Sequence, residues 1–199
     1  MTYNNPRAKL LWDTLRLDLV NNGFPVQERP PTTEQSSSRL SVALPEDHQG
    51  RSRTVTLSLR LLDPNMAQKI AKEVNEIDAH AESNAIDQDA VILLFEMTFP
   101  FELPVPDDIQ TAMRRRIDLL QMVTTLNANF DMPGFTLSDD GRYAMYRYGL
   151  LSRITVIDPA SVIQILNAIF VLAELCGGSI EDLATGKVTL FEMQKNLVS

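Results

Sequence analysis

The residues of this chain that could do chemistry gather around its two histidines. His48 and His80 each have acidic neighbours, and carboxylates beside an imidazole could hold a hard cation or serve a metal-dependent enzyme. The spacing is not that of an EF-hand, and no second histidine lies at helical distance. Solvated acidic surface is therefore the favoured interpretation, and a metal-dependent sensor or enzyme at His80 is the alternative. The acidic neighbours are Glu46 and Asp47 for His48, and Glu76, Asp78 and Glu82 for His80.

No other motif indicates a reaction. Cys176 is the single cysteine and lies in an apolar helical run, which predicts a small buried side chain rather than a nucleophile. Gly177-Gly178 is not followed by Lys-Ser/Thr, so it predicts a helix end and not a phosphate loop. Asp139-Asp140 lies in Ser-Asp-Asp-Gly, which is typical of a turn. The sequence therefore predicts a protein without catalysis, cofactor or metal.

Composition narrows the class of protein further. The chain has 199 residues, 44% of them hydrophobic, and a net charge of −8. Such an apolar content predicts a folded chain, and this length predicts a single domain over residues 1–199. The acidic balance argues against nucleic-acid binding, which needs clustered Lys and Arg.

Charge is unevenly distributed along the chain. No Lys or Arg occurs from Glu73 through Met113, a segment with ten acidic residues, and Arg114, Arg115 and Arg116 follow directly. The acidic segment would attract basic partners. The arginines fit a solvated helix face, a site for an acidic partner, or a contact within a larger assembly.

The N-terminal residues have no basic region followed by an apolar stretch, so we expect no signal peptide. Its longest apolar tract, Ser161 to Cys176, is interrupted by Gln164, Asn167 and Glu174, so we expect neither a transmembrane helix nor membrane binding. These features predict a cytoplasmic protein.

Hydrophobic periodicity predicts the elements. A helix begins at Pro6, and alternating strands follow at 39–44 and 54–61 as a hairpin. Residues 29–38 are rich in Pro and Ser and predict a flexible loop, and residues 63–89 predict an inserted helix and loop. Residues 90–99 predict a strand that is covered on both faces.

The second half predicts a helix from Pro106, a hairpin over 133–148, and a helix from Pro159 to Gly177-Gly178. Ser179 and Asp182 would cap a short closing helix. The order α-β-β-(α)-β-α-β-β-α is not strictly alternating, which favours an α+β fold with an antiparallel five-stranded sheet and helices packed on it. The helix predicted from Pro106 carries the apolar residues Ile109, Met113, Ile117, Leu120 and Val123, with Leu119, Met122 and Leu126 alongside.

This order of elements resembles the type III secretion chaperone fold and the related YbjN-type bacterial domains. The resemblance is carried by the strand from Val91 to Phe99, the helix ending at Asn127, the Pro133-Gly-Phe135 segment and the strand up to Tyr148. It implies a small, acidic, cytoplasmic, often dimeric protein that binds extended protein segments without catalysis or cofactor. The helix at 64–81 and the chain beyond the last long helix depart from that pattern.

We therefore expect a non-enzymatic protein-binding module that forms a homodimer. This expectation is based on a surplus of apolar residues on the strand 90–99 and on the helices 106–126 and 159–176. Such a surplus suggests a subunit interface or a peptide groove. For each aromatic and Met candidate, an ordinary core position is the favoured interpretation and partner binding is the alternative. The candidate partner-binding residues are Phe95, Met97, Phe99, Tyr146, Tyr148, Arg114, Arg115 and Arg116.

Overall fold

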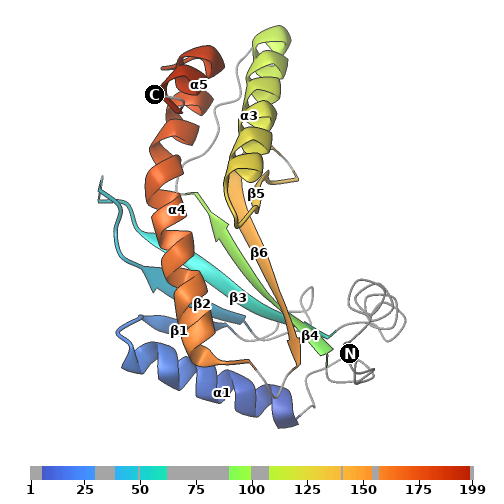
Figure 1. Ribbon diagram of the computed structural model, residues 1–199, viewed down its shortest axis with the longest axis vertical. Coiled ribbons are helices and arrows are strands. Elements are labelled where there is room, and N and C mark those ends of the chain that lie inside the picture. Colours follow the sequence, from blue (N-terminus) through green and yellow to red (C-terminus); the bar gives the residue numbers. More distant parts are fainter. Residues whose placement is uncertain are drawn as a thin grey trace. The chain divides into compact units, whose positions relative to one another are not determined.

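A computed structural model describes residues 6–29, 39–48, 50–61, 90–99, 108–139, 141–153 and 157–197. The helices (Figure 1) are α1 (Pro6–Asn21), α3 (Ile109–Asn129), α4 (Pro159–Thr185) and α5 (Leu190–Leu197). The strands are β1 (Val26–Arg29), β2 (Arg39–Leu44), β3 (Arg53–Leu61), β4 (Ala90–Thr98), β5 (Phe135–Leu137) and β6 (Ala144–Arg153). The predicted helix and loop at 63–89, with His80, and residues 30–38 of the predicted flexible loop lie outside the described residues.

The predicted α+β fold with an antiparallel sheet is confirmed, but the sheet has six strands in place of the five expected. Their order is β1-β2-β3-β4-β6-β5. The sixth strand is β1, which pairs antiparallel with β2 and places Val26 opposite Val42. Arg29, predicted to begin a flexible loop, ends this strand. Sequence patterns missed β1 because it has only four residues and Val26 is its single apolar one.

Strand β4 has one buried face. Its odd-numbered residues from Val91 to Met97 are buried, whereas Ile92 and Leu94 on the other face are half-buried. The alternation follows from the two-residue period of a strand. The core therefore lies against the odd-numbered face, and the second face is covered only in part.

Aspartates begin the two long helices. Asp108 is the N-cap of α3, and its carboxylate accepts the Thr111 N–H at 2.8 Å. Asp158 accepts the Ser161 N–H at 3.1 Å at the predicted start of α4. Hydrogen bonds from Thr111 lower the pKa of Asp108, and those from Ala160 and Ser161 lower the pKa of Asp158.

The predicted end of α4 is wrong. The helix continues through Gly177-Gly178 to Thr185, because Ile180 and Leu183 extend its buried side beyond the glycines. The residue that follows its end is Gly186, whose φ of 76° suits the left-handed position there. Ser179 is inside α4, so the predicted capping box is wrong too.

The capping box is one step further along the chain, at the start of α5. Thr189 N–H donates to Glu192 Oε2 at 2.8 Å, and Glu192 N–H donates to Thr189 Oγ1 at 3.3 Å. This reciprocal pair is the Thr-x-x-Glu pattern that begins many helices.

Contacts group the chain into two compact units. Unit 1 comprises Met1–Val42, Thr56–Leu94 and Gly149–Ile163, and unit 2 comprises Ala43–Val55, Phe95–Tyr148 and Gln164–Ser199. In unit 1, α1 packs against β1 and buries Trp12, Leu15 and Leu19. In unit 2, α3 packs against β5. A single domain over residues 1–199 stays a prediction.

Candidate functional site

Four of the predicted partner-binding side chains are core residues of unit 2. Phe95, Met97, Phe99 and Tyr146 are each at most 2% exposed. The Phe99 and Tyr146 rings pack on the ring of Phe135, with centroids 6.3 and 5.1 Å from it. A partner cannot reach these four side chains in this conformation, so the ordinary core position is the interpretation that their burial supports.

Tyr148 is the predicted aromatic that reaches the surface. It is half-buried, and its ring centroid lies 6.2 Å from that of Phe95 in a tilted arrangement.

The Pro133-Gly-Phe135 segment fastens the β5–β6 hairpin to α3. Asn127 Oδ1 accepts the N–H groups of Gly134 and Phe135 at 2.9 Å, and Asn127 Nδ2 donates to the Phe135 carbonyl oxygen at 2.9 Å. Tyr146 Oη donates to the Met132 carbonyl oxygen at 2.9 Å, and burial raises the pKa of Tyr146 to about 12. One asparagine thus satisfies three backbone groups and holds the hairpin on the helix.

The three arginines do not form one patch. Consecutive residues of a helix point about 100° apart. A side chain at Gly186 would approach the Arg115 guanidinium to 3.0 Å, and one at Gly141 would approach that of Arg116 to 3.3 Å. Arg115 therefore lies beside the α4–α5 connection and Arg116 beside the β5–β6 turn. None of the three arginines forms an ion pair within the described part of the chain.

An exposed apolar stripe runs along α3. Ile109, Met113, Ile117 and Leu120 share one side of the helix by their spacing, and their exposed fractions lie between 47 and 75%. The residues that α3 buries are instead Leu119, Met122, Val123 and Leu126.

The sequence predicted both sets of residues as one wide apolar face. Only one arc of a helix can pack on the sheet, and the burial shows which arc it is. The other four residues, Ile109, Met113, Ile117 and Leu120, are called the α3 stripe below.

A buried carboxylate lies between β2 and β3. The Asp47 side chain is fully buried and accepts hydrogen bonds from the Arg51 N–H and Nε at 2.8 Å and from Arg53 Nη2 at 3.0 Å. The prediction that Asp47 belongs to solvated acidic surface is therefore wrong. The two nearby arginines, which supply its partners, were the signal in the sequence.

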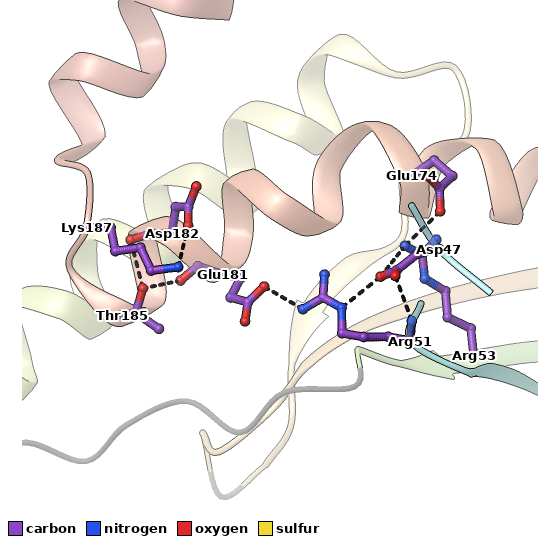
Figure 2. A network of polar contacts seen from close by, with 8 residues as sticks. All are labelled: Asp47, Arg51, Arg53, Glu174, Glu181, Asp182, Thr185 and Lys187. Carbon is purple, nitrogen blue, oxygen red and sulfur yellow. Dashed lines mark hydrogen bonds and ion pairs between the residues drawn. The ribbon is translucent and has the colours of Figure 1, made fainter. Parts of the chain in front are cut away.

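The same arginines reach carboxylates of α4 (Figure 2). Arg51 Nη1 donates to Glu181 Oε2, and Arg53 Nη2 lies 3.0 Å from Glu174 Oε1. The exposed His48 ring also lies near Glu174, with Nδ1 3.1 Å from Oε2. Asp47, Arg51, Arg53, Glu174 and Glu181 together are called the hairpin clamp below.

The hairpin clamp has three carboxylates for two guanidinium groups. Partial burial lowers the pKa of Arg51, but hydrogen bonds and charge attraction from Asp47 and Glu181 outweigh this effect and raise the pKa above its ordinary value. The Nε and Nη1 of Arg53 are buried and make no hydrogen bond within the residues described. The arrangement holds the β2–β3 hairpin on α4 and contains no nucleophile.

Cys176 is buried in α4, as predicted. Burial raises the pKa of its thiol to about 11. Near pH 8 only about one thiol in a thousand would be ionised, against about a quarter for a free cysteine. We therefore expect Ellman's reagent to label the folded chain about 100-fold more slowly than the chain in guanidinium chloride. Equal rates under the two conditions would contradict the burial.

The described residues contain no group of three or more His, Cys, Asp or Glu side chains that could hold a metal ion. The metal-dependent alternative concerned His80, which lies outside them.

Among the helices that the structure describes, α4 is long and apolar enough to cross a membrane, judged by length and composition alone. The predicted apolar tract was shorter because it stopped at Cys176. Core helices pass the same test, and a third of the apolar window is buried within the chain. Cytoplasmic localisation stays a prediction.

Comparison with known proteins gives no relative of this chain: no family model, no curated protein and no solved structure matches it.

Proposed function

We propose that this chain is a non-enzymatic protein-binding module whose partner is an acidic, amphipathic segment of another protein. The observation that carries the proposal is the α3 stripe, with four large apolar side chains exposed along about three turns of a helix. Contiguous apolar surface of this kind is typical of interaction sites. An amphipathic helix could pack on it through residues spaced three and four apart.

Charge favours an acidic partner over a second copy of the chain. Arg116 lies three residues after Met113 and four before Leu120, so it shares their side of α3. If two copies of α3 packed antiparallel about the middle of the stripe, Arg116 of one copy would meet Arg116 of the other. Such a like-charge contact opposes association, whereas carboxylates of a partner would attract this arginine. The chaperone-like role implied by the resemblance is compatible with this proposal and stays a prediction.

The test is quantitative affinity capture from native extract with the full chain and with Met113→Glu/Ile117→Glu. We expect the double variant to capture at least about tenfold less of the partner than the native chain does, because central apolar contacts dominate binding energy. Arg116→Glu should weaken the same partner. Leu151→Glu is the matched control, since Leu151 on β6 is 46% exposed and Leu120 is 47% exposed. Circular dichroism would check that each variant keeps its fold.

Two outcomes would contradict the proposal. One is capture of the same proteins at the same level by the native chain and the stripe double variant. The other is a homodimer in sedimentation at micromolar concentration that the stripe variant dissociates, which would make a second copy the partner.

A further inference from the structure

A pocket of about 550 Å³ is lined by residues of α3, by the end of α4 and by the connection from α4 to α5. Its α3 wall includes Arg114, Arg115 and Asp118, and its lining from α5 includes Leu190 and Phe191. The volume is within the range of pockets that hold small organic ligands. The α3 stripe does not line this pocket.

The pocket carries one net positive charge. Arg114 and Arg115 contribute two positive charges that no ion pair offsets within the described residues, and Asp118 contributes one negative charge. Two neighbouring acids are already engaged. Glu192 caps α5 through Thr189, and Asp182 pairs with Lys187 at 3.1 Å.

Arg115 has its place at the pocket because residue 186 has no side chain. Gly186 also lines the pocket, and its φ of 76° is one that other residues rarely adopt. A Cβ there would lie 3.0 Å from Arg115 Nη2. The guanidinium thus lies directly against the backbone of the connection.

The lining that comes from α4, α5 and the connection between them is mostly apolar. Phe191 is 77% exposed, the most of any large apolar side chain in the described ranges, and Leu190 beside it is half-buried. An exposed phenylalanine at the edge of a cationic pocket leaves apolar area that a ligand could cover.

We infer that this pocket binds a small organic monoanion, a carboxylate joined to an aliphatic or aromatic group. The carboxylate pairs with Arg114 and Arg115, whose planar guanidinium groups suit its two oxygens. The apolar group packs on Leu190 and Phe191. A single negative charge matches the net charge of the pocket, and Asp118 disfavours a dianion such as phosphate.

Calorimetric titration of the full chain with octanoate tests this inference. We expect saturable one-to-one binding of octanoate with a dissociation constant below about 1 mM. Acetate and inorganic phosphate should bind at least about tenfold more weakly than octanoate. Arg115→Gln should weaken octanoate by about tenfold, and Phe191→Ser should also weaken it. Arg116→Gln is the matched control and should change the affinity less than about twofold, because Arg116 lies beside Gly141 and not in the pocket.

The inference is overturned if octanoate shows no saturable binding, if octylamine binds as well as octanoate, or if Arg115→Gln and Arg116→Gln weaken binding equally. Arg114→Gln, at an exposed position, serves as the second variant should Arg115→Gln fail to fold. The protein-binding proposal is separable, since it depends on Arg116 and the α3 stripe and this inference on Arg115 and Phe191.

Discussion

Asp47→Ala is expected to lower the free energy of unfolding by about 3–5 kcal/mol, because it leaves the buried Arg53 guanidinium without its nearest fully buried counter-charge. The Arg53 side chain is only 2% exposed, and its other carboxylate contact, Glu174, is itself a quarter exposed. The Arg51 N–H loses its acceptor at the same time. Urea denaturation followed by circular dichroism measures the change.

The control is an exposed ion pair in the same unit. Asp182→Ala removes the ion-pair partner of Lys187. The Asp182 side chain is 43% exposed and that of Lys187 is 65% exposed, so the free energy of unfolding should change by less than about 0.5 kcal/mol. Adding Arg53→Met to Asp47→Ala should recover a large part of the loss, since an apolar side chain no longer needs a counter-charge. If Asp47→Ala is as mild as Asp182→Ala, the carboxylate is not buried in the way the structure indicates.

Gly134→Ala is expected to destabilise the chain by about 3 kcal/mol or more through a clash that small movements cannot relieve. A Cβ at this position would lie 2.1 Å from the carbonyl oxygen of Arg147, which is backbone of the adjacent strand. Any shift of Gly134 also disturbs its carbonyl, which accepts the Arg147 N–H at 2.8 Å, and its N–H, which donates to Asn127. Thermal or urea unfolding measures the loss.

Gly178→Ala is the matched control for this substitution. A Cβ at Gly178 meets nothing within 4 Å, and the residue lies inside α4. Alanine should therefore stabilise the helix by about 0.5–1 kcal/mol, opposite in sign to Gly134→Ala. Two changes of the same sign would show that something other than the Arg147 contact governs Gly134.

Elements that begin or turn at a short, characteristic run of residues were predicted correctly from the sequence. The Ser-Asp-Asp-Gly turn predicted the β5–β6 hairpin, and Asp158-Pro159 predicted the start of α4. The end of α4 was mistaken because a glycine pair stops a helix only when no packing extends beyond it. Gly177 lies in the helix beside the Phe99 ring, which a Cβ at this position would contact at 3.4 Å.

The candidate surfaces were predictable only in part. Periodicity predicted that α3 has more apolar surface than one contact can cover, and the α3 stripe is that surplus. It could not say which arc faces the core, since Ile117 and Leu119 are equally apolar. The pocket could not be predicted, because it joins Arg115 to a connection about 70 residues later in the chain, a proximity that depends on tertiary packing.

The hairpin clamp also bears on the order of folding events. Its two contacts with α4, Arg51 to Glu181 and Arg53 to Glu174, join residues 130 and 121 positions apart, so the ends of a very long loop must meet before they form. Because closing a long loop costs entropy before the contact can stabilise the chain, we expect these contacts to form after the folding transition state. The clamp should therefore act mainly on the unfolding rate, lengthening the lifetime of the native state without hastening its formation.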